Sequence, residues 1–427
     1  MGVRVESRHR FRGWRPLLLM LLSLLATLPA AAWELDARLK WFGSLTALPE
    51  EDLQRQQTGT PEYADDVDLR LMFRHRRGPA LLIVDHSTTL SRSDLARFPG
   101  VPLRSLDRTP ETDKRRVMDL TWELDEGKRH RLLHRLDRLA VRYSPGAWSL
   151  TLGRDAVSWG NGRVFQTLDL FNPFAPTAVD KDYKTGDDLM LLERLLPSGG
   201  DLQVLAVGRR DMQGKVSRDA ASLAGKWRLF AGEGEVELLA GRHYEDQVYG
   251  LALRWPLGNA MVRSDLAATR LNSGTWKLSG LLNMDYSLVL GGRNVYVFGE
   301  YFHNSFGVRE LPDAAIDYPE PLIQRLGRGE LFNLMRDYLV AGTSVEWHPL
   351  WNHSTTLIGN LQDASLLLQT QVSFEPGDNQ LVELGLVHPI GGRGDEFGGV
   401  PLARDEAGSV LTVGGGTSAY LRWVYYL

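Results

Sequence analysis

Apolar and polar residues alternate along most of the chain, in segments of about 10 residues separated by short Gly, Pro or Asp turns. In the segment 364–375, Leu366, Leu368 and Val372 fall on one side, whereas Gln369 and Gln371 fall on the other. A period of two places successive side chains on opposite faces of a β-strand. The pattern recurs at 33–46, 65–76, 80–90, 276–286 and 337–347. The chain is therefore predicted to be all-β.

The length of the segments and the position of their aromatic residues favour a membrane barrel over a soluble sandwich. Sandwich strands run about 5 or 6 residues, whereas these segments of about 9 to 12 residues match a tilted strand that crosses hydrocarbon. Aromatic residues gather at their ends, as in interfacial girdles: Trp33, Trp148, Trp255, Trp276, Trp347, Trp351, Trp423 and Tyr425. The opposite faces carry charged residues, which are unfavourable in a dry core but suit a water-filled lumen. We predict a transmembrane antiparallel β-barrel.

The connections predict the number of strands. Short turns fall at one end of the barrel, and long connections at about 157–187, 211–221, 304–336 and 390–416 fall mainly at the other. The alternation breaks near 91–114 and gives an odd count, although single-chain bacterial barrels have even counts. We expect about 18 strands, within a range of about 16 to 20. The segment 319–336 is expected to form a short loop helix, and a role as a plug stays open.

The two ends of the sequence indicate export. Residues 1–32 combine a basic head, an apolar middle of about 12 residues and a small-residue end, which is typical of a signal peptide rather than a membrane anchor. The barrel is then expected over 33–427. The last strand, 419–427, resembles the terminal strand that the outer-membrane assembly machinery of Gram-negative bacteria recognises, although Leu427 replaces the usual Phe or Trp.

Composition excludes several classes of function. The chain carries 49 Lys and Arg against 53 Asp and Glu, and removal of the leader makes it more acidic, which argues against a nucleic-acid partner. It has no cysteine, so disulfides, thiolate metal sites and covalently attached haem are excluded. Neither a nucleophile elbow nor a phosphate-binding loop occurs. We expect no cofactor, no bound metal and no enzymatic activity.

The connection 157–187 is too apolar to extend into water. It carries Trp159, Phe165, Leu168, Leu170, Phe171 and Phe174, and long loops of such composition are usually functional and packed. We predict that this loop folds into the mouth of the barrel. Gly160, Gly162 and Pro173 are interpreted as turn formers.

This region also carries a resemblance. The run GRDAVSWGNG followed by LDLFNPFAP, within residues 134–188, resembles the strand and following loop of several families of Gram-negative outer-membrane porin-like barrels. The resemblance implies a β-barrel channel whose loop 159–188 narrows the pore. It implies no catalytic residues.

Charged residues on such a loop and the facing wall set the selectivity of a pore. The candidates are Asp155, Arg163, Asp169, Asp180, Lys181, Asp182, Lys184, Asp187 and Asp188, with Arg154 as a further counter-charge. Their acidic majority predicts a mild preference for cations. The alternative is that they are solvated loop charges without a role.

The favoured function is passive diffusion of small hydrophilic solutes or ions across the outer membrane. One alternative is a barrel that sheathes a multihaem cytochrome in an electron conduit, and another is a lipid-modifying enzyme. The sequence leaves open whether the barrel is a monomer or a homotrimer, because lipid and a second barrel both fit an apolar outer face.

Overall fold

The computed structural model describes residues 33–94, 113–179, 183–404 and 410–427. The predicted signal peptide lies outside these residues, as do Asp180, Lys181 and Asp182. The strands are β1 (Trp33–Ala47), β2 (Glu62–Arg77), β3 (Ala80–Ser93), β4 (Thr121–Glu126), β5 (His130–Tyr143), β6 (Trp148–Asp155), β7 (Asp187–Leu195), β8 (Asp201–Val207), β9 (Ser222–Ala231), β10 (Gly234–His243), β11 (Asp246–Leu257), β12 (Ala260–Arg270), β13 (Trp276–Leu290), β14 (Arg293–Asn304), β15 (Asp337–His348), β16 (Trp351–Asn360), β17 (Leu366–Gly377), β18 (Gln380–Ile390), β19 (Val400–Arg404), β20 (Val410–Val413) and β21 (Thr417–Tyr426). The helices are α2 (Arg55–Thr58), η2 (Asp113–Arg115), η3 (Ala315–Asp317) and α3 (Glu320–Arg328).

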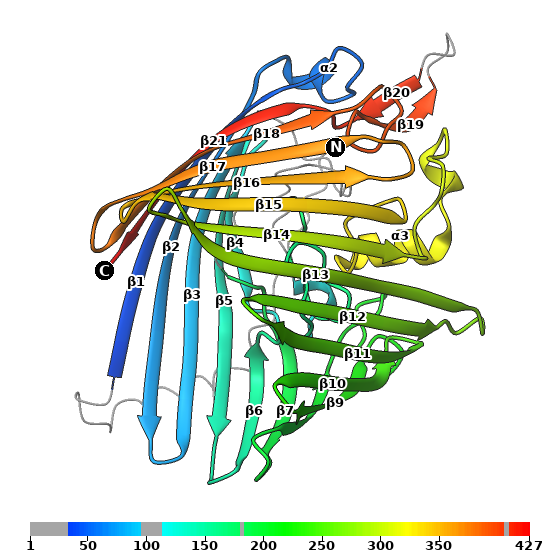
Figure 1. The fold of residues 1–427 in the computed structure, drawn as a ribbon. Coiled ribbons are helices and arrows are strands. Elements are labelled where there is room, and N and C mark those ends of the chain that lie inside the picture. The colour runs from blue at the N-terminus through cyan, green and yellow to red at the C-terminus, as the bar shows by residue number, and fades with distance from the viewer. Residues whose placement is uncertain (1–32, 95–112, 180–182, 405–409) are drawn as a thin grey trace, which may run out of the picture.

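The strands form a closed 18-stranded antiparallel barrel (Figure 1). Neighbours along the chain pair with one another, except that β3 pairs directly with β5 and β18 pairs with β21. β21 also pairs with β1, with Trp41 opposite Trp423, and this pairing closes the ring. Closure satisfies the backbone groups that an open sheet edge would expose to lipid. The prediction of about 18 strands is confirmed.

The short strand β4 accounts for the odd number of strands that the sequence pattern suggested. It pairs with residues 131–135 of β5, and β6 pairs with residues 139–143 of the same strand. Because β6, β7 and β8 have only 8, 9 and 7 residues, β4 and a bridge between Arg116 and Arg209 continue the wall beyond their ends. The additional strand is therefore a short antiparallel partner of β5 inserted into the wall, and most of the predicted break, 95–112, lies outside the described residues.

The alternation of the strands produces the expected two faces. On β13, Trp276, Leu278 and Leu282 point outward and are 53–59% exposed, whereas Leu281 and Asn283 point inward and are 1–3% exposed. Opposed residues in antiparallel strands lie on the same face, so the pattern continues into β12 and β14. No helix among the described residues is both long and apolar enough to cross a membrane.

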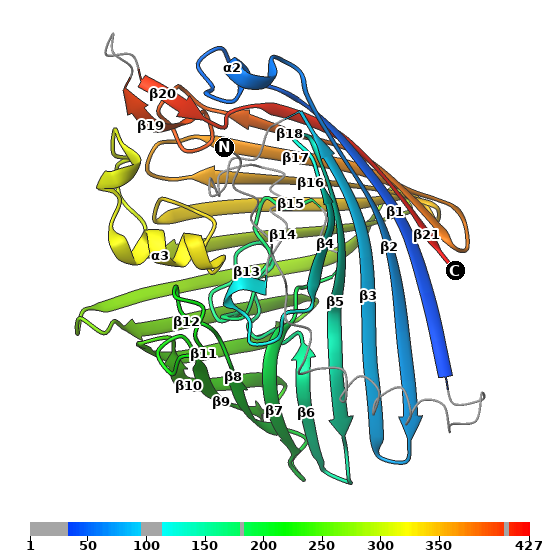
Figure 2. The same ribbon diagram turned by 180° about the vertical axis from the view of Figure 1, so that it is seen from behind.

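The connections divide between the two ends as predicted (Figures 1 and 2). Tight turns join β2 to β3, β9 to β10, β11 to β12 and β13 to β14 at the end where the chain terminates after β21. The long connections 48–61, 156–186, 208–221, 305–336 and 391–416 lie at the opposite end, together with α2, α3, β19 and β20.

The inner wall is not polar throughout, which corrects the expectation of a uniformly wet lumen. Inward positions of β14 to β16, including Phe302, Tyr338 and Ile358, form one apolar cluster with Leu322 and Leu326 of α3. The helix predicted within 319–336 is confirmed. The sequence pattern could not show the apolar cluster, because its residues alternate like lumen-facing positions and are covered by α3, in the connection between β14 and β15, and by Phe165 of the connection between β6 and β7.

Candidate functional site

Residues 156–186, here called the inner loop, connect β6 to β7, and their described parts, 156–179 and 183–186, run inside the barrel. Trp159, Phe165, Leu168 and Phe171 of this loop are only 2–3% exposed. They pack on inward-facing side chains: Phe165 stacks on Phe302 of β14 with ring centroids 4.3 Å apart. The prediction that the loop packs inside the barrel is confirmed.

The tip of the inner loop, Trp159 to Phe165, is held by polar side chains of β8 and β11 to β14. Trp159 Nε1 donates to Gln203 Oε1 of β8 at 2.9 Å. The backbone N–H of Asn161 donates to Asp265 of β12 at 2.7 Å, and its side-chain oxygen accepts from Arg254 of β11 at 2.8 Å. The side chain of Asn161 is thus satisfied by the wall itself.

Glu300 of β14 binds the next part of the tip. Its carboxylate accepts the backbone N–H groups of Arg163 at 2.7 Å, Val164 at 3.2 Å and Phe165 at 2.8 Å. Successive N–H groups that converge in this way form an anion-binding concavity. Here the anion is a side chain of the barrel wall.

The two glycines of the tip allow this approach. Gly160 has a φ of +89°, and a Cβ there would lie 2.7 Å from Asp265 Oδ2. A Cβ on Gly162 would lie 1.7 Å from the carbonyl oxygen of Phe165. The sequence WGNG therefore encodes a tight turn that brings its backbone against the wall.

The returning arm of the inner loop carries a buried ion pair between Asp169 and Lys184. Lys184 Nζ also donates to the carbonyl oxygen of Val157 at 2.5 Å, which joins the two arms. Burial raises the pKa of Asp169 to about 6, even with the Lys184 ammonium beside it. Farther along, Gln369 of β17 donates to the carbonyl oxygen of Thr177 at 2.9 Å.

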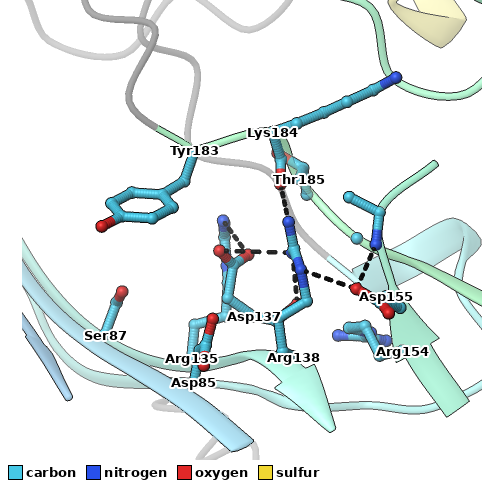
Figure 3. Close-up of polar contacts among 12 residues, drawn as sticks. Asp85, Ser87, Arg135, Asp137, Arg138, Arg154, Asp155, Tyr183, Lys184 and Thr185 are labelled. Carbon is cyan, nitrogen blue, oxygen red and sulfur yellow. Dashed lines mark hydrogen bonds and ion pairs between the residues drawn. The ribbon is translucent and has the colours of Figure 1, made fainter. Parts of the chain in front are cut away.

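The loop then meets a charged part of the wall formed by β1, β2, β3 and β5 (Figure 3). The ring of Tyr183 lies over two guanidinium groups, 4.0 Å from Arg70 and 4.7 Å from Arg38. Arg70 donates to Asp137 at 2.7 Å and to Asp85 at 3.1 Å. Asp85 and Asp137 are thus both matched by Arg70.

The foot of the loop is fixed by a second buried network. Arg154 of β6 is 1% exposed and donates to Asp188 of β7 and to Asp113 of η2, each at 2.8 Å. Asp187 accepts from Arg209 at 2.8 Å. These pairs tie the inner loop to the inserted wall segment that precedes β4.

The nine predicted charged residues therefore differ in position. Asp155 pairs with Arg138 and Arg142 on the inner wall, and Arg163 reaches Asp285 of β13 at 2.9 Å with its own side chain 40% exposed. Asp169, Lys184, Asp187 and Asp188 are buried in ion pairs, and Asp180, Lys181 and Asp182 lie outside the described residues. The sequence did not single out Glu300 or Asp265, whose one signal was an inward position on an alternating strand.

Five arginines of the inner wall are more exposed than their carboxylate partners. Side chains of Arg74, Arg142, Arg163, Arg228 and Arg254 are 29–42% exposed, and those of their partners Asp85, Asp155, Asp285, Asp201 and Glu235 are 5–14% exposed. At these five pairs, water inside the barrel meets guanidinium groups in front of carboxylates, whereas Arg38, Arg70 and Arg422 are at least as buried as the carboxylates they bond.

A further cluster of hydrogen bonds lies at the end of the barrel that carries the long connections. Glu396, between β18 and β19, is 8% exposed and accepts from Leu334 N at 2.6 Å, Tyr338 Oη at 2.5 Å and Asn360 Nδ2 at 2.7 Å. All three donors are neutral, and burial raises the pKa of this carboxyl to about 7. Glu396 thus joins two long connections above the apolar cluster.

No protein-family model matches the sequence, and no curated protein is significantly similar to it. Among solved structures, OccK11 (OpdR) of Pseudomonas aeruginosa superposes with a TM-score of 0.51 and 10% identity, covering 92% of this chain and 96% of the other. OccK5 (OpdH) of the same organism gives a TM-score of 0.50 and 12% identity, covering 92% and 98%. A BenF-like porin from Pseudomonas fluorescens gives 0.48 and 10%, with coverage of 92% and 98%. At these identities the likeness to the first two shows that the barrel fold is shared.

Proposed function

We propose that this chain is a Gram-negative outer-membrane channel through which small hydrophilic solutes diffuse passively. The observation that carries the proposal is a closed 18-stranded barrel with an apolar outer face and a charged inner wall, crossed by a folded loop. Barrels of about 16 to 18 strands enclose an aqueous path. Residues 1–32 would direct export as a signal peptide, and β21 would be recognised by the assembly machinery.

The inner wall favours anions over cations in this channel. Of the carboxylates that suggested a cation preference, Asp155, Asp169, Asp187 and Asp188 are paired and largely covered, and Asp180 and Asp182 lie outside the described residues. Elsewhere on the inner wall, Arg74, Arg142 and Arg163 face the water in front of their carboxylate partners. A positive surface concentrates anions along a narrow path. Small anionic and neutral hydrophilic solutes are therefore the favoured cargo.

Neither alternative function gains support. A cytochrome sheath needs an open lumen, but the chain's own inner loop spans the lumen from β8 to β17. A lipid-modifying enzyme needs an accessible nucleophile at the outer face. Ser222, His243 and Glu330 form a hydrogen-bonded chain of 2.9 and 3.0 Å, but Ser222 is 4% and His243 2% exposed, and both face inward.

Swelling of proteoliposomes tests the proposal. Vesicles that contain the purified, heat-modifiable barrel should swell in isotonic solutions of a pentose and, faster, of its sugar acid, and should not swell in dextran. Vesicles that swell in none of the three solutions would exclude a diffusion channel.

A further inference from the structure

Two buried carboxylates of the wall, Asp265 and Glu300, receive the tip of the inner loop. Asp265 is 0% and Glu300 1% exposed. Both contact backbone N–H groups of the loop, and they sit on β12 and β14 with Asn283 of β13 between them. A buried carboxylate is expensive to desolvate unless donors surround it. The donors here come from the loop.

Apart from the side-chain amide of Asn161, these contacts are made to the backbone of the loop. They therefore fix where the tip lies and do not depend on its other side chains. Glu300 binds three consecutive N–H groups, 163 to 165, and Asp265 binds the N–H and the side-chain amide of Asn161. Asn283 bridges the two sites, because it donates to the carbonyl oxygen of Asn161 at 3.1 Å and to Glu300 at 3.3 Å. Four of the five residues from Asn161 to Phe165 are thereby fixed to the wall.

The positions of the side chains of the tip follow from this placement of its backbone. Phe165 is set against Phe302 and Tyr338, which continue into the apolar cluster under α3. Arg163 is directed to Asp285 and lies over Tyr296, 5.4 Å from its ring centroid. The side chain that meets the water is thus aimed by contacts made through its backbone.

We infer that Asp265 and Glu300 are positioning residues that clamp the tip of the inner loop and thereby set the width of the pore. The inference rests on the proposed channel function. Without the clamp, the barrel stays closed by its 18 strands, but the tip leaves the wall and the loop no longer narrows the path.

The test compares Glu300→Gln, Glu300→Ala and Asp265→Asn with the matched control Glu346→Gln. Glu346 is another inward-facing wall glutamate, and it bonds Asn294 rather than the loop. Heat-modifiable migration on gels first verifies that each barrel has folded. Two readouts then follow: single-channel conductance in planar bilayers, and amide hydrogen exchange of the peptide that covers 157–175.

The clamp variants should exchange faster within 157–175 and should conduct roughly twofold more with greater open-channel noise, because an 18-stranded barrel without a folded loop leaves a wide aqueous channel. Glu346→Gln should match the wild type in both. Unchanged exchange in the clamp variants would overturn the inference, as would faster exchange with unchanged conductance. If the wild type itself forms no channel, the proposed function fails, while hydrogen exchange still reports whether the clamp exists.

Discussion

Removing two exposed arginines from the inner wall should reduce the anion preference of the channel. Arg74 and Arg142 suit this test, because each shares its carboxylate with a second arginine. Asp85 keeps Arg70 at 3.1 Å, and Asp155 keeps Arg138 at 3.2 Å. The substitutions Arg74→Gln and Arg142→Gln therefore remove positive charge from the water-filled surface without leaving a carboxylate unpaired.

The magnitude follows from Coulomb's law. A unit charge about 7 Å from a passing ion contributes about 0.6 kcal/mol in water, and salt of about 0.1 M reduces this to about 0.3 kcal/mol. The favoured ion gains this energy and the disfavoured ion loses it, so each substitution should lower the chloride-to-potassium permeability ratio roughly threefold. The assay is the reversal potential in a salt gradient across a planar bilayer. Lys215→Gln, in the exposed connection 208–221, is the control with the same charge change.

A cation-selective wild-type channel would refute this reasoning. The reasoning would also be refuted if both arginine variants kept the wild-type reversal potential, since the exposed guanidinium groups would then not border the ion path.

Three further predictions concern the groups that hold the inner loop and its cover. Asp188→Asn removes one of the two carboxylates that the buried Arg154 bonds and leaves Asp113, so it should lower the unfolding free energy by about 1.5 to 3 kcal/mol, as read from urea titrations. Gly162→Ala pushes a Cβ into the carbonyl of Phe165, and should raise hydrogen exchange of the tip as Glu300→Gln does, whereas Gly327→Ala, in α3, should not. Glu396 has a pKa of about 7, raised from 4.5. Its packed state is therefore most stable at low pH and should lose about 3 kcal/mol as pH rises from about 4.5 to about 7. Trypsin cleavage at Arg393, divided by the trypsin activity on a short peptide at the same pH, should increase over that range, and Glu396→Gln should remove this dependence; an equal ratio at pH 5 and pH 8 in the wild type would contradict it.

The period-two pattern was sufficient to predict the barrel, because it reports which face each residue occupies. Outward residues such as Trp276, Leu278 and Leu282 of β13 alternate with polar inward residues such as Lys277, Ser279 and Asn283, so the side that faces lipid could be identified from the sequence. The inserted strand β4 could not be identified from the sequence, since a short segment that pairs with β5 next to β6 has no pattern of its own. The apolar inner cluster was missed for a related reason: Phe302 and Tyr338 occupy lumen-facing positions and become dry only when α3 covers them.

The sequence predicted which loop forms the candidate site, but not which of its charged residues are paired. The apolar residues of 157–187 indicated a packed loop, and the structure confirms it. Which charges meet water depended on partners far apart in sequence: Arg70 and Asp137 are 67 residues apart, and Arg163 and Glu300 are 137 residues apart. Under the proposed anion preference, pairing of this kind would reverse the apparent sign of the lumen, because a count of acidic residues does not show which of them an arginine covers.

In the proposed channel, apolar side chains face lipid while a charged inner wall encloses a water-filled path. Single-channel recording of the purified barrel in a planar bilayer measures this path. We expect discrete, ohmic current steps from the chain alone, with no cytochrome or other protein added. Silent bilayers, from protein shown to have inserted as a folded barrel, would contradict it.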